Sequence, residues 1–276
     1  MNFRGKAIYT PKGKAGEYAQ WACNFFTGCS NDCEYCFCKR GVMSHAWDTA
    51  PHLKKCFTSE RHAFNVFCRE LDKCEDKIGS SGLLFSFTTD PLLPETRDLT
   101  FKAMEEAIFR GINVKILTKR VDWLDEFITR TEIQTILYGE GKHRIAFGFT
   151  LTGFDEKEPS ASLTDERIEA MRELHDLGFK TFASIEPIIT PAMSRNMIAS
   201  TREFCDLYKV GIISGKGKNY YNRAHVEKLF EWLFKEATDC RIYLKDSFID
   251  YLGISRDDLP PHFVSSSYNM FPENEK

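Results

Sequence analysis

The sequence lacks the apolar segments that would carry a protein into or across a membrane. None of its apolar runs approaches the ~20 residues that span a bilayer. The N-terminus from Met1 to Lys6 is polar and has no apolar core of the kind found in a secretory signal. Internal repeats and low-complexity tracts are also missing from the sequence. These absences argue against membrane, secreted and repeat proteins, and we expect a cytoplasmic protein.

The sequence also lacks a strong charge of either sign. Its 276 residues carry a net charge of −3, which excludes a bulk attraction to nucleic acid and leaves room only for a local basic groove. With 42% hydrophobic and 28% charged residues, the composition is that of a globular protein with a substantial core. We expect a single domain over residues 1–255. Residues 256–276 are rich in proline, serine and charge and are predicted to form an extended tail.

Cysteine, in contrast, is abundant. The chain has ten cysteines, but a chain of this size without an export signal is not expected to depend on disulfides. Half of them crowd into residues 23–38, namely Cys23, Cys29, Cys33, Cys36 and Cys38. This crowding indicates a metal site.

The run Cys29-x3-Cys33-x2-Cys36 is the most informative part of that segment. Three thiolates at this spacing can hold one iron–sulfur cluster, but they cannot supply the four ligands of a closed structural site. A [4Fe–4S] cluster held by three cysteines keeps one iron open for chemistry. The alternative is a zinc site completed by Cys38 or His45, although zinc favours paired C-x2-C knuckles and no second pair is present.

Strand-like and helix-like segments alternate along the chain, which predicts an α/β fold with parallel strands. The predicted strands cover residues 21–26, 83–87, 114–117, 145–151, 180–185, 209–214 and 241–244, and helical spacing marks residues 61–77, 100–110, 162–178 and 226–237. About six strands precede the C-terminal segment, fewer than the eight of a closed barrel. We therefore expect a partial (β/α)6 barrel, related to the TIM barrel, with its site on the loops at the carboxyl ends of the strands.

Five segments at the ends of these strands follow one another in a characteristic order: Asn24–Cys29, Thr88–Glu95, Leu117–Lys119, Glu158–Gly178 and Glu186–Pro191. Together with the cysteine run, they resemble the radical S-adenosylmethionine (SAM) superfamily, and within it the spore photoproduct lyase-like branch often labelled DNA repair photolyases. The cysteine run is specific to the superfamily, whereas the later segments are persuasive only jointly. The resemblance extends from about Asn24 to Pro191.

The resemblance implies a cluster loop at residues 27–40, in which Cys29, Cys33 and Cys36 bind a [4Fe–4S] cluster and SAM binds its open iron. One electron, normally from a reduced flavodoxin or ferredoxin, would then cleave SAM to methionine and a 5′-deoxyadenosyl radical. That radical would abstract hydrogen from a substrate that the sequence does not identify.

Polar residues at the strand ends are the candidates for holding SAM. Lys119 ends an apolar strand, where a lysine is costly to bury without an anion, so we expect it to pair with the SAM carboxylate. By resemblance, Thr89 would hold the amino end of SAM, and the hydroxyl of Thr150 would suit a ribose. The full predicted set is Tyr35, Thr88, Thr89, Lys119, Thr150 and Glu186.

Each candidate also has a structural interpretation. Thr88 and Thr89 precede an Asp-Pro pair, which commonly starts a turn, and Thr150 is also a typical strand residue. Glu186 follows an apolar strand and normally needs a cationic partner such as Lys119. At the level of the whole chain, the alternative to an enzyme is a non-enzymatic zinc or iron–sulfur binding module.

One departure from the lyase branch affects the expected chemistry. Spore photoproduct lyase itself has a hydrogen-donating cysteine just before the segment that aligns with Thr88–Asp90, and this chain has Phe87 there. The repair reaction is therefore not carried over with the fold. A nucleic-acid substrate is suggested by the family label and by the glycine-rich, basic and aromatic segment at 214–221, but the acidic net charge argues against it.

Overall fold

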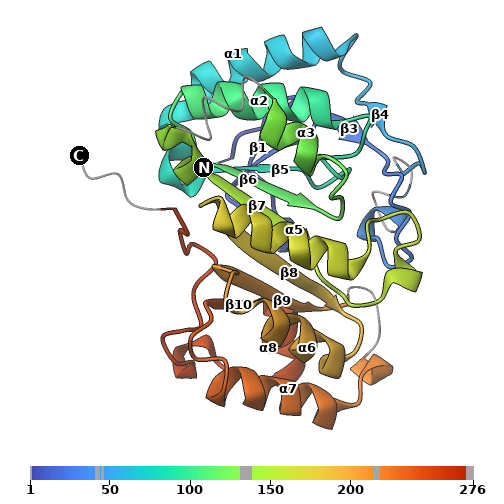
Figure 1. The fold of residues 1–276 in the computed structure, drawn as a ribbon, viewed down its shortest axis with the longest axis vertical. Coiled ribbons are helices and arrows are strands. Elements are labelled where there is room, and N and C mark those ends of the chain that lie inside the picture. Colours follow the sequence, from blue (N-terminus) through green and yellow to red (C-terminus); the bar gives the residue numbers. More distant parts are fainter. Residues whose placement is uncertain (1, 41–43, 45–46, 131–138, 214–217, 272–276) are drawn as a thin grey trace.

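The computed structural model describes residues 2–40, 44, 47–130, 139–213 and 218–271. Its main sheet has eight strands in the order β1 (Ile8–Tyr9), β2 (Trp21–Cys23), β5 (Leu83–Phe85), β6 (Val114–Thr118), β7 (Ile145–Thr150), β8 (Lys180–Ile188), β9 (Leu207–Ile212) and β10 (Ile242–Leu244). Strand β1 is antiparallel to β2, and all the other neighbours are parallel. The predicted α/β fold with an incomplete barrel is thereby confirmed (Figure 1).

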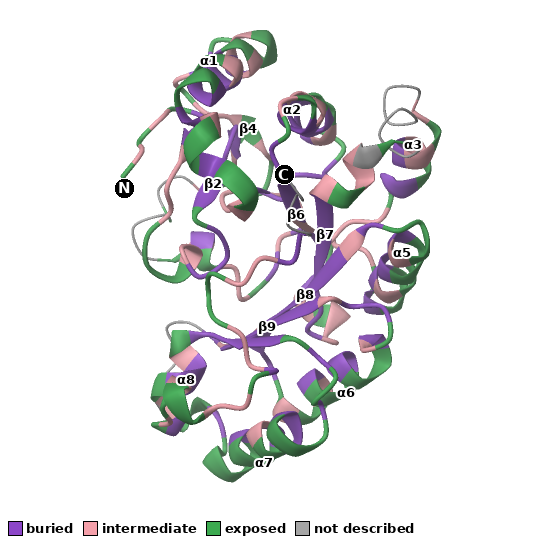
Figure 2. Cartoon of the chain, turned by 90° about the vertical axis from the view of Figure 1, so that its left-hand side faces the viewer, coloured by how far each residue is buried: buried purple, intermediate pink, exposed green. Residues whose placement is uncertain are grey.

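Helices connect the parallel strands and lie around the outside of the sheet (Figures 1 and 2). They are α1 (Glu60–Ile78), α2 (Arg97–Phe109), α3 (Leu124–Thr129), α5 (Thr164–Asp176), α6 (Pro191–Thr201), α7 (Arg223–Lys235) and α8 (Asp246–Leu252). Short 3-10 helices occur at Gly13–Ala15, Phe37–Lys39, Gly79–Ser81, Glu140–Arg144, Asp155–Lys157, Lys218–Tyr220 and Arg256–Asp258. None of the described helices is both long and apolar enough to span a membrane.

Helix α1 illustrates why these segments form helices. The Ser59 hydroxyl accepts a hydrogen bond from the backbone N–H of His62, which caps the first turn. Its apolar residues recur at steps of three and four and are buried, including Ala63, Phe67 and Leu71. The chain leaves the helix at Gly79, whose φ of +52° favours glycine.

The first predicted strand, residues 21–26, is interrupted in the structure. Strand β2 ends at Cys23, and β3 (Phe26–Thr27) instead pairs with β4 (His52–Leu53) in a separate two-stranded sheet. Asn24 lies between them, where its side chain donates to the Tyr9 hydroxyl and accepts from the backbone N–H of Phe87. The cluster loop therefore starts from a small hairpin beside the barrel.

The buried hydrophobic residues form two separate clusters, one between the sheet and the helices and one inside the barrel. Gly148 of β7 allows the ring of Phe182 to cross the interior, because a Cβ at residue 148 would lie 2.2 Å from that ring. At the amino ends of the strands, Met270 and Phe271 are buried against Tyr18, Leu84, Ala146, Phe182, Leu207 and Tyr243. The described part of the predicted tail thus packs against the barrel, and the division of the chain at residue 255 stays a prediction.

Candidate functional site

A cavity of about 510 Å³ opens at the carboxyl ends of the strands. We call it the site cavity. Its walls come from the cluster loop and from the ends of β5, β6, β7, β8 and β10. It brings together all nine residues predicted from the sequence: Cys29, Cys33, Tyr35, Cys36, Thr88, Thr89, Lys119, Thr150 and Glu186. The position of these residues is thus established, whereas their roles stay predictions.

The cluster loop is shaped by two backbone constraints. Gly28 has a φ of +81°, and a Cβ at residue 28 would lie 2.2 Å from the carbonyl oxygen of Ala50, so only glycine fits this close approach. The next residue, Cys29, donates its backbone N–H to the carbonyl oxygen of Asp48 at 3.0 Å. Both contacts fix the start of the loop against the segment that precedes β4.

The three cysteines of the loop are free thiols, with Cys33 buried and the other two half-buried. Burial raises the pKa of Cys29 to about 12 and also raises that of Cys33. A hydrogen bond from the Cys38 thiol lowers the pKa of Cys36 to about 6. Among the described residues, no three His, Cys, Asp or Glu side chains are already gathered as a metal site. The cysteines thus line one cavity without converging on a single point.

The cavity suits an iron–sulfur cluster in the chemistry of its donors. Cys29, Cys33 and Cys36 line it from one short loop, at the spacing that a cluster with an open iron requires, and the Cys38 thiol of the same loop lines it as well. The buried side-chain oxygen of Asn31, within this loop, has no hydrogen-bond partner in the described part of the chain. A donor brought in with a ligand would satisfy it.

Asp90 joins the cluster loop to the barrel. One of its carboxylate oxygens accepts from the Asn31 side chain and from the backbone N–H of Lys119, both at 2.8 Å. The other accepts from the Thr118 hydroxyl at 2.7 Å and from the N–H of Leu92 at 3.0 Å. Asp90 therefore links the cluster loop to the end of β6, in addition to starting a turn. The only sequence signal for it is the Thr-Asp-Pro segment.

Tyr35 forms a triad with the buried residues Glu158 and Arg167. Its hydroxyl donates to Glu158, which also accepts from Arg167, and Arg167 donates to the carbonyl oxygen of Thr150 at 2.6 Å. Glu158 is 2% exposed and Arg167 is fully buried. Burial and the neighbouring Glu158 carboxylate raise the pKa of Tyr35. The aromatic residue before the last cysteine is therefore anchored to the end of β7 and the start of α5.

Lys119 approaches the cysteines at the end of β6. Its ammonium lies 5.5 Å from the centre of the Tyr35 ring. Burial lowers the pKa of Lys119, but the attraction of Cys33, Glu158 and Asp90 outweighs burial and raises it overall. The described residues include no carboxylate at ion-pair distance from Lys119. Its charge can therefore meet an anion inside the site cavity.

Glu186 has a different partner from the one suggested by the sequence. The expected partner was a basic residue such as Lys119, and Glu186 accepts instead from Lys245 at 2.6 Å and from the Tyr18 hydroxyl at 2.8 Å. Strands β8 and β10 lie on either side of β9, and Gly211 of β9 has no side chain to keep Glu186 and Lys245 apart. Lys245 and Tyr18 were missed because they are far from Glu186 in the sequence and outside the region of resemblance.

The other threonines and thiols near the site have modest roles in the structure. The Thr88 hydroxyl donates to the carbonyl oxygen of Phe26 at 2.6 Å, and Cys38 lies with its sulfur 3.6 Å from the carbonyl oxygen of Phe87. Phe87 lines the cavity, as its place in the sequence suggested. His45 and residues 214–217 lie outside the described residues.

Comparisons with known proteins agree with this fold. No protein-family model matches the sequence. A curated relative, the uncharacterized protein ORF301 of Acidianus two-tailed virus, is 23% identical over 246 residues and is matched over 84% of this chain and 78% of that protein.

Solved structures give a clearer match. Spore photoproduct lyase aligns with a TM-score of 0.53 and 14% identity over 82% of this chain, and Streptococcus suis SuiB with 0.54 and 13% over 85%. The chain spans 64% of the lyase and 51% of SuiB. Related structures hold AdoMet with dinucleoside spore photoproduct in the lyase and S-adenosylmethionine in SuiB. At these identities the likeness shows the fold alone: this chain has the partial-barrel fold of the radical SAM enzymes.

Proposed function

We propose that this chain is a radical SAM enzyme that holds a [4Fe–4S] cluster on Cys29, Cys33 and Cys36 and binds SAM beside it. One observation carries the proposal. The three thiols line the same cavity as Lys119 and Glu186, at the carboxyl ends of a partial barrel of the radical SAM type. Sites in barrels of parallel strands are built at this end.

When bound, the cluster would supply one electron that cleaves SAM to methionine and a 5′-deoxyadenosyl radical, which takes a hydrogen atom from the substrate. The protein's own part is orientation. The Lys119 ammonium would pair with the SAM carboxylate. The Thr88 hydroxyl, which donates to a backbone carbonyl, keeps its lone pairs for an ammonium, as would Thr89.

The remaining candidates complete the proposed SAM site. Thr150 lies buried at the end of β7, where its hydroxyl would meet a ribose, and Tyr35 would form the wall beside the cluster. Glu186, held by Lys245 and Tyr18, would orient SAM or the substrate from the opposite wall. A reduced flavodoxin or ferredoxin is the proposed electron donor. In support, Phe37 next to Cys36 is 52% exposed, so the cluster loop reaches the surface.

The test is anaerobic reconstitution with iron and sulfide, followed by metal analysis and by addition of SAM and dithionite. We expect about four irons per chain and formation of 5′-deoxyadenosine. A non-enzymatic module is the second candidate, because the Cys38 thiol beside Cys36 offers a fourth ligand for zinc. One bound zinc, or a cluster without any 5′-deoxyadenosine, would establish the module and exclude the enzyme.

The proposed substrate class is nucleic acid, and the residues that line the cavity support it. Lys12, Lys14 and the aromatic residues Phe37 and Trp47 all line it, and a combination of cations and aromatic rings suits single-stranded nucleic acid. Binding to a single-stranded oligonucleotide should then weaken steeply as salt is raised. If no binding is measured at low salt, the substrate is a peptide or a small molecule instead.

A further inference from the structure

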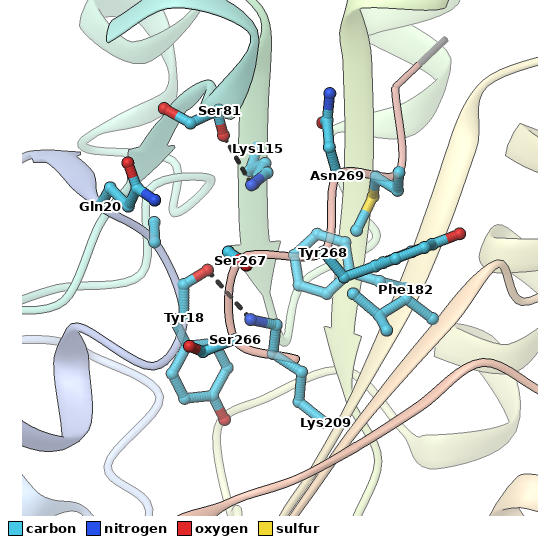
Figure 3. Close-up of a pocket in the computed structure, with 13 residues that line it drawn as sticks. Tyr18, Gln20, Ser81, Lys115, Phe182, Lys209, Ser266, Ser267, Tyr268 and Asn269 are labelled. Carbon is cyan, nitrogen blue, oxygen red and sulfur yellow. Dashed lines mark hydrogen bonds between the residues drawn. The ribbon is translucent and has the colours of Figure 1, made fainter. Parts of the chain in front are cut away.

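A second, much smaller space lies inside the barrel at the amino ends of the strands. We call it the base chamber, and Figure 3 shows the residues around it. Its volume is about 20 Å³. The chain segment Ser266–Met270 and the stretch Tyr18–Gln20 line it, and Lys115 of β6 and Lys209 of β9 reach it from the sheet (Figure 3).

The two lysines are buried and lack acidic partners. Lys115 is 8% exposed and Lys209 is 6% exposed. Lys115 donates to the carbonyl oxygen of Ser81 at 2.7 Å, whereas Lys209 donates to the carbonyl oxygens of Glu17 at 2.7 Å and Tyr18 at 3.0 Å. In the described part of the chain, neither forms an ion pair, and no carboxylate lines the chamber.

The two carboxylates next along the barrel, Glu17 and Glu186, are already paired with another cation. Lys245 lies 2.6 Å from Glu186 and 3.5 Å from Glu17. The Glu17 carboxylate also accepts from the Tyr243 hydroxyl and from the backbone N–H of Asp246. Lys245 thus takes up both carboxylates, Glu17 and Glu186, and three lysines stand against two carboxylates in this part of the interior when all five groups are ionised.

The hydrogen-bonding capacity of the chamber is also incompletely used. An ammonium group has three protons to donate. Lys115 uses one of them and Lys209 two, so each has at least one left. The neighbouring side chains of Ser266, Ser267 and Asn269 can also donate. An uncompensated buried charge is costly, and an anion that accepts from both ammonium groups would remove that cost.

We propose that the base chamber binds one small inorganic anion, a halide such as chloride, between Lys115 and Lys209. Its size sets the class of ligand. A single water needs roughly 10–15 Å³, so a chamber of about 20 Å³ favours a single small ion over a larger anion.

Titration of the lysines is consistent with this assignment. Burial lowers the pKa of Lys115 to about 8. Burial, together with repulsion from Lys115 and Lys245, also lowers the pKa of Lys209, while Glu17 and Glu186 act in the opposite direction. A bound anion would reverse these shifts and keep both lysines protonated.

The test is the thermal unfolding of the whole protein at constant ionic strength, with sodium chloride replacing sodium gluconate, whose anion is too large to enter. We expect the Tm to rise with chloride and to saturate, as for a ligand that binds only the folded state. Equal Tm values in chloride and gluconate would overturn the proposal. Stabilisation by phosphate but not by chloride would overturn the size assignment.

Two variants connect the effect to the chamber. Lys115→Met and Lys209→Met keep the side-chain length but remove the charge, so the chloride-dependent rise in Tm should be lost. Lys228→Met, at an exposed position of α7, is the matched control and should keep the full rise. A rise that persists in both chamber variants would refute the site. Should they fail to fold, crystals of the unaltered protein soaked in bromide give the second measurement: an anomalous peak between the two ammonium groups supports the proposal, and a chamber without one contradicts it.

Discussion

The two ends of the barrel are built from the same strands but differ in every physical property that matters for function. The site cavity at the carboxyl ends has a volume of about 510 Å³ and is lined by thiols, hydroxyls and both signs of charge. The base chamber at the amino ends has about 20 Å³ and is lined by lysines, hydroxyls and apolar groups. The cluster loop and the ends of the strands form the first, whereas the C-terminal segment covers the second.

The difference shows how one fold separates chemistry from stability. At the carboxyl ends, polar groups hold one another in place and leave space between them, as the Asp90 and Glu158 networks do. At the amino ends, Met270 and Phe271 fill the space. Changes at the first end should therefore alter binding before stability, whereas changes at the second end should alter stability and, through it, the proposed effect of chloride.

The largest effect that would separate the two ends comes from the cluster loop. Cys33→Ala should abolish iron binding after anaerobic reconstitution, because two thiolates cannot hold the cluster, while the Tm of the apoprotein changes little. Iron and sulfide analysis measures the outcome. Cys38→Ala is the matched control and should retain the iron. If the two variants exchange these results, the ligand assignment is wrong.

Arg167 lies at the carboxyl end of the barrel, but we expect it to contribute to stability, and Arg167→Met tests this exception to the comparison. The variant leaves the Glu158 carboxylate buried without its cation, which costs about 3–5 kcal/mol of the free energy of unfolding. Urea unfolding at neutral pH measures it. Arg172→Met, on the same helix but 44% exposed in its side chain, is the control and should lose much less. Equal losses in the two variants would show that the triad does not stabilise the protein.

The titration of Lys115 tests the base chamber through the pH dependence of stability. Its folded-state pKa of about 8 lies below its ordinary value of 10.5, so between these values the folded chain binds fewer protons than the unfolded chain. Stability should therefore rise with pH across this window, by about 3 kcal/mol in total. In gluconate, the Tm of the unaltered protein relative to that of Lys115→Met should rise from pH 8 to 10.5. Chloride should make this gain smaller, and a gain of the same size in both salts would contradict anion binding beside Lys209.

The smallest effect is expected at the outer edge of the cluster loop. Lys157 pairs with Glu34 at 3.0 Å, but both side chains are partly in water, and exposed pairs contribute little. Lys157→Ala should thus leave the Tm and the iron content nearly unchanged. A loss of iron comparable to that of Cys33→Ala would mean that this pair, and not the buried triad, holds the loop.

Most of the fold was predictable because hydrophobic period and turn residues are local signals. The parallel strands, helices α1, α2, α5 and α7, and the incomplete barrel all follow from apolar spacing. Helices α3 and α8 were missed, since short helices offer few turns in which a period can be recognised, and α6 was missed as well. The break of the first strand at Asn24 depends on a hydrogen bond to the N–H of Phe87, which no local pattern reveals.

The site was predictable only in part. Residues that follow strands could be placed together because parallel strands end at one edge of the sheet, and all nine do line one cavity. The hydrogen-bonding and ionic partners of these site residues were not predictable. Glu186 and Lys245 meet across β9, and Tyr35 meets Glu158 and Arg167 across the mouth of the barrel. Such contacts depend on three-dimensional packing between segments distant in the sequence.

Tyr18 borders both spaces. On the cavity side its hydroxyl contacts Glu186 and Ser184, and on the opposite side its carbonyl accepts from Lys209. The stretch that precedes β2 therefore acts as a partition within the barrel. Removing the aromatic ring would take away a wall that both spaces share, and solvent could then approach the proposed radical from behind. Under the proposed function, a side chain outside the cluster loop would in this way affect how long the radical survives.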